Sequence, residues 1–163
     1  MTTILIGLGE LAVSNTPGDS IKTLGLGSCV AVTALHSQSG AIGMVHIVLP
    51  ESKVDGSKAK ERPGYFADTA VARLFDEMNR ITKSEGRYIV KLAGGAAVLS
   101  VSPANANMNI GKRNVLATKK ALWKRGIGAV AEDVGGSESR SIRLDHGEVS
   151  VEITRGGKVI SKI

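Results

Sequence analysis

Residues 23–29 read Thr23-Leu24-Gly25-Leu26-Gly27-Ser28-Cys29, and they hold the only cysteine of the chain. The glycines predict a tight turn between two strand-like runs. One strand-length later, residues 44–47 read Met-Val-His-Ile, which places His46 inside an apolar run. A cysteine nucleophile needs a base close by, and an imidazole can serve as that base. We therefore interpret Cys29 as a nucleophile and His46 as its base.

Residues 30–49 predict a β-hairpin with a polar, glycine-ended turn in its middle. If this turn is centred after Gln38, Ala31 pairs with His46, and Cys29 becomes the diagonal neighbour of His46. Both side chains then point to the same face, because side chains alternate along a strand. Diagonal neighbours have Cβ atoms about 7–8 Å apart, within reach of a long side chain. A slip of one residue would separate them, and the sequence leaves that register open.

The rest of the chain predicts an α/β sandwich of mainly antiparallel strands with two main helices. An apolar stripe at helical spacing runs through residues 65–82, and a glycine ends a second helical segment at 112–125. Strand-like runs occupy residues 3–6, 20–26, 88–93, 128–132, 139–144, 149–154 and 158–162. Residues 51–64 are polar without periodicity and predict a long loop, either a lid or a solvated connection, and residues 96–108 have no clear period.

Length and composition limit the function classes. The chain has 163 residues, and we expect one domain over residues 1–163. Its net charge of +6 favours acidic partners. However, the basic residues are scattered, and one Trp, two Tyr and two Phe are too few for a base-stacking platform. We therefore expect no nucleic-acid binding.

A single cysteine cannot form an internal disulfide. The first residues lack the basic region of a signal peptide, and no apolar run reaches the roughly 18 residues of a membrane helix. These features predict a protein of the reducing cytoplasm without membrane insertion.

Two glycine-rich stretches match a dinucleotide fingerprint, and both fail its structural test. Residues 7–12 precede Pro17-Gly18, which interrupts the helix that must open there, and no acidic residue lies at the ribose position. Residues 126–131 precede a strand-like run instead of a helix. Each stretch is interpreted as a turn, and no cofactor or metal is expected.

The chemistry around Cys29 needs more than a base. Backbone N–H groups at Gly27, Ser28 and Cys29 could hold an oxyanion, and Thr23 is the nearest candidate to orient His46. On pattern alone this is a weak signal, because a lone cysteine is usually a small buried apolar residue and a lone strand histidine is usually structural.

Several motifs resemble the CheD family of chemoreceptor glutamine deamidases. The resemblance spans nearly the whole chain, apart from residues 97–107. Its motifs are Thr-Leu-Gly-Leu-Gly-Ser-Cys-Val at 23–30, His-Ile-Val-Leu-Pro at 46–50, Tyr-Phe-Ala-Asp-Thr-Ala at 65–70, Lys-Leu-Ala-Gly-Gly-Ala at 91–96, Asn-Ile-Gly-Lys-Arg-Asn-Val at 109–115 and Glu-Asp-Val-Gly-Gly at 132–136 with Arg140.

The resemblance implies a Cys–His–Thr site of Cys29, His46 and Thr23. It implies conversion of receptor glutamines to glutamates through a thioester, and some members also hydrolyse glutamyl methyl esters. Its implied fold is similar to the catalytic domain of cytotoxic necrotizing factors. The implied partners are cytoplasmic domains of methyl-accepting chemotaxis receptors and, for some members, a CheC-like phosphatase.

Two other classes remain open. A cysteine peptidase would use the same pair of side chains on main-chain amides, and a non-catalytic adaptor would only bind a receptor or a CheC-like phosphatase. Other polar residues have structural interpretations: Asn109 and Asn114 as helix caps, and Arg113 and Arg140 as exposed cations. His36 and His146 lie beside turns and are expected to be exposed.

Overall fold

Two five-stranded sheets and a layer of helices make up the computed structural model, which describes residues 1–84, 86–98 and 109–163. Across the first sheet lie β1 (Thr3–Ile6), β3 (Ser20–Leu26), β8 (Arg140–Asp145), β9 (Val151–Arg155) and β10 (Lys158–Lys162). Across the second lie β2 (Leu11–Ser14), β5 (Ile42–Ile47), β4 (Val30–His36), β6 (Tyr88–Gly94) and β7 (Ala131–Val134).

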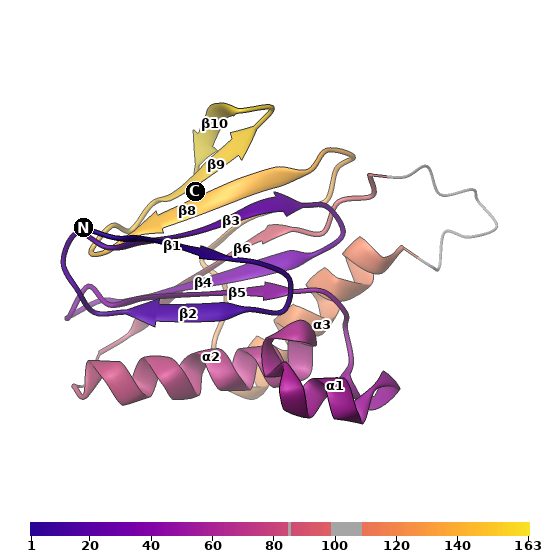
Figure 1. Ribbon diagram of the computed structural model, residues 1–163, viewed down its shortest axis with the longest axis horizontal. Coiled ribbons are helices and arrows are strands. Elements are labelled where there is room, and N and C mark those ends of the chain that lie inside the picture. Colours follow the sequence, from indigo (N-terminus) through magenta and orange to yellow (C-terminus); the bar gives the residue numbers. More distant parts are fainter. Residues whose placement is uncertain (85, 99–108) are drawn as a thin grey trace.

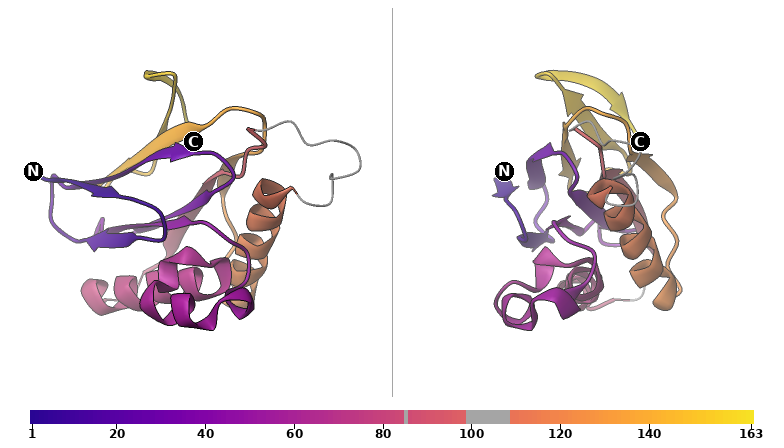
Figure 2. Two further views of the ribbon diagram at one scale, coloured as in Figure 1. Left: turned by 45° about the vertical axis from the view of Figure 1, so that its right-hand side comes forward. Right: turned by 90° about the vertical axis from the view of Figure 1, so that its right-hand side faces the viewer.

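The strand pairing is mainly antiparallel. Only the β1–β3 and β6–β7 pairs are parallel among the pairs of named strands in the described residues. The two main helices, α2 (Ala67–Thr82) and α3 (Ile110–Lys124), lie below the second sheet, and the first sheet lies above it (Figure 1). The turned views keep this order of layers (Figure 2). The predicted α/β architecture with two main helices is confirmed.

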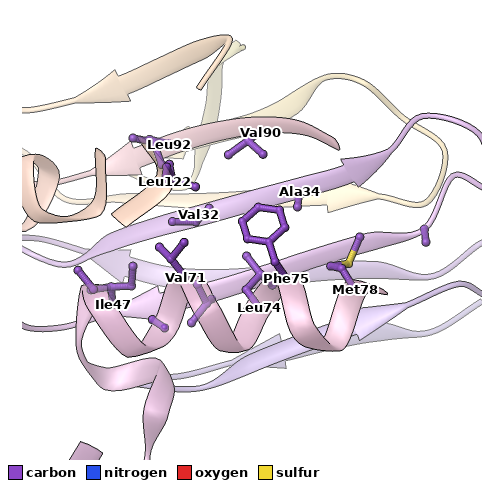
Figure 3. Packing of buried hydrophobic residues seen from close by; sticks show 14 residues of the cluster. Val32, Ala34, Ile47, Val71, Leu74, Phe75, Met78, Val90, Leu92 and Leu122 are labelled. Atoms are coloured by element: carbon purple, nitrogen blue, oxygen red, sulfur yellow. The ribbon is translucent and has the colours of Figure 1, made fainter. Parts of the chain in front are cut away.

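One apolar core joins the second sheet to α2. The buried stripe of this helix includes Val71, Leu74, Phe75 and Met78, spaced three or four residues apart as one helical face requires. Figure 3 shows these side chains directed at the strands that carry Val32, Ala34 and Ile47.

A second apolar core lies between the sheets. It takes the opposite faces of the same strands, including Ala31 and Leu35 of β4 and Ile42 and Met44 of β5, together with side chains of the first sheet such as Ile21. The alternation of strand side chains therefore decides which residues face the helices and which face the other sheet. His46 belongs by alternation to the inter-sheet face.

The prediction of a long loop over residues 51–64 is wrong. These residues form a short helix, α1 (Gly56–Glu61), between two 3-10 turns, η1 (Ser52–Val54) and η2 (Pro63–Tyr65). None of the α1 residues is buried, so an apolar period could not predict it. Its local signal is Asp55, whose side chain accepts a hydrogen bond from the Lys58 backbone N–H.

Smaller differences concern strand ends and burial. The second hairpin strand stops at Ile47 rather than Leu49, and β7 starts at Ala131 rather than residue 128. His36 is buried, not exposed, and its ring Nδ1 lies 2.9 Å from Ser39 Oγ. Most of the irregular stretch at 96–108 lies outside the described residues. None of the helices described is long and apolar enough to cross a membrane.

Candidate active site

The candidate site lies at one end of the molecule, where both sheets and a helix meet. Strand β3 ends there, β4 begins there after the glycine turn, and β5 ends there, on the right of Figure 1. The site therefore combines the turn of residues 23–29 with the end of the His46 strand.

The hairpin register matches the one that a turn after Gln38 predicts. Ala31 pairs with His46 and Val30 pairs with Ile47. Cys29 lies just before β4 and belongs to the same inter-sheet cluster as Ala31 and Ala93. His46 is 1% exposed and Cys29 is 9% exposed, so both residues are buried. No hydrogen bond between their side chains is found among the described residues.

Thr23 reaches His46 from the other sheet. Its Oγ1 lies 2.7 Å from His46 Nδ1 and donates a hydrogen bond of 2.9 Å to the carbonyl oxygen of Ile6. A hydroxyl has one proton, which Ile6 receives, so the oxygen must accept from Nδ1–H. The hydrogen-bond network thus assigns the neutral imidazole with Nε2 unprotonated. Nε2 has no partner among the described residues and is left to accept a proton.

Burial keeps both side chains neutral. Desolvation lowers the pKa of His46 to about 4, against a smaller opposing effect of the Glu10 carboxylate. Desolvation raises the pKa of the Cys29 thiol, and the Cys29 backbone N–H counters this in part. At neutral pH the pair is therefore a thiol and an imidazole rather than a thiolate and an imidazolium.

Three consecutive carbonyl groups fix the backbone at the nucleophile. The Gly27 oxygen accepts from Ala96 N–H at 2.8 Å, and the Cys29 oxygen accepts from Gly95 N–H at 2.8 Å. Between them, the Ser28 oxygen accepts from the side-chain amide of Asn114 at 2.9 Å. The N–H groups of Gly27, Ser28 and Cys29 have no backbone acceptor in the part of the chain that the structure describes. They remain available to an oxyanion.

Glycine is required where β6 passes the nucleophile. Gly94 has a φ of +111°, and a Cβ there would lie 2.2 Å from the Cys29 carbonyl oxygen. A side chain at this position would push the end of β6 away from Cys29. The Gly-Gly pair at 94–95 therefore allows the end of β6 to pass close to the Cys29 backbone.

A pocket of about 510 Å³ adjoins the glycine turn. Gly25, Gly27 and Ser28 form one wall, and residues 96–98 and 109–111 form much of the rest. Most of its lining is apolar or backbone, and Cys29 and His46 are not among the residues that line it.

Two residues of this region were misinterpreted from sequence. Asn114 is fully buried inside α3, while Asn109 alone caps that helix through Lys112 N–H. Arg140 is 2% exposed and donates to the carbonyl oxygens of Asp133 and Gly135. Asn114 lies five residues beyond the cap, where asparagine disfavours a helix, and this position was the available signal. Among the described residues, no three His, Cys, Asp or Glu side chains gather as they would around a metal ion.

Comparison with known proteins shows which family the chain belongs to. The family model of CheD chemotactic sensory transduction matches residues 48–155. The chain is 49% identical to the probable chemoreceptor glutamine deamidase CheD of Syntrophotalea carbinolica, over 97% of this chain and 98% of that protein. It is 42% identical to the chemoreceptor glutamine deamidase CheD of Thermotoga maritima, over 94% of each chain. The protein therefore belongs to the CheD family.

Proposed function

We propose that this protein is a chemoreceptor glutamine deamidase with Cys29 as nucleophile, His46 as general base and Thr23 as the group that orients the base. The observation that carries the proposal is the contact of 2.7 Å between Thr23 Oγ1 and His46 Nδ1. With Nδ1 held by Thr23, Nε2 has no hydrogen-bond partner among the described residues and can accept the thiol proton. The activity itself is the one that the names of the curated relatives print.

The first half of the reaction releases ammonia. As Cys29 Sγ attacks the glutamine side-chain carbonyl carbon, His46 Nε2 takes the thiol proton. The carbonyl oxygen becomes an oxyanion, which the N–H groups of Ser28 and Cys29 bind. The protonated His46 then gives its proton to the departing nitrogen, the C–N bond breaks, and a thioester remains on Cys29.

The second half restores the enzyme. Neutral His46 accepts a proton from a water molecule as that water attacks the thioester carbonyl. The C–S bond breaks, the thiol regains its proton from His46, and the product is a glutamate side chain. One water is consumed and one ammonia is released for each glutamine converted.

Burial of the nucleophile favours a side-chain amide over a main-chain amide. Cys29 is buried, with 9% of the residue exposed. The amide of glutamine stands at the end of a flexible side chain and can reach a buried residue, whereas a peptide bond would have to bring two flanking residues with it. This argues against the peptidase.

Finer features of the family complete the proposal. We assign the protein to the cytoplasm, where it would meet the cytoplasmic domains of chemotaxis receptors and a CheC-like phosphatase. We also propose one domain over residues 1–163, a fold similar to the cytotoxic necrotizing factor catalytic domain, and hydrolysis of receptor glutamyl methyl esters by the same thioester route. No cofactor is part of this mechanism.

The test is mass spectrometry of a cognate receptor cytoplasmic domain incubated with wild-type protein or with Cys29→Ala. Deamidation adds about one dalton at a glutamine, whereas loss of a methyl ester removes about 14 Da and proteolysis yields fragments. We expect the one-dalton gain at specific glutamines with the wild-type protein only. Full activity of Cys29→Ala would refute the nucleophile. Receptor binding without any mass change would favour the adaptor.

A further inference from the structure

Asn114 joins the two halves of the candidate site through a single side chain. Its Nδ2 donates to the carbonyl oxygen of Ser28 at 2.9 Å and to the carbonyl oxygen of Val48 at 2.9 Å. Ser28 directly precedes the nucleophile, and Val48 follows the base by two residues. Asn114 is 0% exposed and comes from α3, an element that contributes neither nucleophile nor base.

The helix does not need this side chain for its own stability. Asn109 already caps α3, and Asn114 lies in the interior of the helix, where an alanine or leucine would favour helix formation. Its Oδ1 has no partner among the described residues, so one buried polar atom is left unsatisfied. An asparagine at this position therefore lowers the stability of the helix. The two hydrogen bonds that its Nδ2 donates explain why it is there.

The bond to Ser28 acts on the peptide group that contains the Cys29 N–H. A carbonyl that accepts a hydrogen bond polarises its peptide, and the N–H of the same peptide becomes a stronger donor. The bond also fixes the plane of this peptide and therefore the direction of the N–H. An oxyanion formed when Cys29 Sγ attacks a carbonyl carbon would lie beside this N–H.

The bond to Val48 sets where that donor lies relative to the base. Beyond Ile47 the chain leaves β5, and the hairpin ladder no longer holds it to β4. Asn114 links the two segments here, because its hydrogen bonds join Ser28, just before Cys29, to Val48, just after the His46 strand. Nucleophile loop and base strand are thus fixed to the same amide group.

We propose that Asn114 is a positioning residue that aims the Cys29 backbone N–H at the developing oxyanion. The inference rests on the proposed deamidase function. If Asn114 has this role, its loss should slow reactions of the Cys29 sulfur that form an oxyanion and spare reactions that do not. Deamidation passes through an oxyanion, whereas alkylation of Cys29 by iodoacetamide is a direct displacement at carbon and forms none. Removal of the Asn114 amide impairs the first reaction far more than the second.

The experiment compares Asn114→Ala with two controls in the same helix. Thr118→Val keeps the volume of a side chain that is also 0% exposed and whose hydroxyl has no described partner. Leu122→Ala destabilises the helix packing without approaching the site, because Leu122 belongs to the core between helices and sheet. Asn114→Ser, whose hydroxyl can donate to only one carbonyl, is the second variant in case the alanine protein does not fold. Receptor deamidation, alkylation rates and thermal unfolding are measured for each.

We expect Asn114→Ala to lower kcat about 10- to 100-fold, with KM and the alkylation rate changed by less than about threefold. At assay temperatures well below their melting temperatures, the Thr118→Val and Leu122→Ala proteins should keep the kcat of the wild-type protein. The inference is overturned if both Asn114 variants keep kcat, or if deamidation and alkylation fall together as in a loosened fold. A wild-type protein without deamidase activity would instead refute the proposed function, and the inference with it.

Discussion

Thr23→Val removes one oxygen from the centre of the candidate site and keeps the shape of the side chain. Thr23 is fully buried, so water cannot replace the lost hydroxyl without a cavity. Two groups lose their partner, the Nδ1–H of His46 and the carbonyl oxygen of Ile6. Both losses destabilise the folded protein, but only the first concerns the reaction.

The kinetic effect follows from the charge that His46 gains. In the ground state Nδ1–H belongs to a neutral ring, and its hydrogen bond is worth about 0.5–1.5 kcal/mol. When Nε2 takes the thiol proton, the same bond comes from an imidazolium and is worth about 1.5–3 kcal/mol. The difference of about 1–1.5 kcal/mol applies only to the charged state. It corresponds to a loss of about 5- to 13-fold in kcat for Thr23→Val.

The assay is steady-state deamidation of a receptor fragment, read by mass spectrometry, with thermal unfolding measured in parallel. Thr23→Ser is the matched control, because it keeps the hydroxyl and loses only a methyl group. We expect its kcat to stay within about threefold of wild type. A folded Thr23→Val protein with wild-type kcat would refute the assigned tautomer and the role of Thr23, as would an equal loss in Thr23→Ser.

The remaining predictions concern pH and the core. Because His46 must be neutral to accept a proton and its pKa is about 4, kcat/KM should be lost only as the pH falls through about 4; an acid limb near 6.5 in the pH profile would contradict the burial argument. Phe75→Ala should lower the free energy of unfolding, measured in urea, by about 3–5 kcal/mol, because Phe75 is 1% exposed in the core between α2 and the second sheet. Its kcat should be unchanged where the protein remains folded, and a lost kcat there would show that the two cores are coupled.

The hairpin was predictable from its two strand-like runs and the polar turn between them, whereas the sequence left its register open. For a turn centred after Gln38, the two-residue period sets which face each side chain occupies. This register and the period together place Cys29 and His46 in one layer, and the pairing of Ala31 with His46 confirms that placement. The stripe of α2 was predictable for a similar reason, since a helix that covers a sheet must bury one face.

Features that depend on contacts between sheets were not predictable in the same way. The place of Thr23 in the chain makes it the nearest candidate to orient His46, yet whether its hydroxyl reaches the ring depends on how the first sheet packs on the second. Asn114 and Arg140 were interpreted as surface or cap residues because sequence spacing does not show burial. Helix α1 buries nothing, so only its capping residue Asp55 could have indicated it.

The neutral state of the candidate pair explains why the site needs so many backbone constraints. In a thiolate–imidazolium pair the nucleophile would already be deprotonated before the substrate binds. Burial makes both charges unfavourable here. Charge must therefore appear only when the substrate carbonyl arrives, and it appears at two places, the imidazole ring and the oxyanion. In the proposed mechanism Thr23 stabilises the charge on the imidazole ring, through an acceptor already in place. In the same mechanism the N–H groups of Ser28 and Cys29 bind the oxyanion, and the carbonyl groups of their peptides are held by Ala96 and Asn114. Since these groups are fixed before the reaction, little reorganisation accompanies the separation of charge, and a buried, uncharged cysteine can still act as a nucleophile.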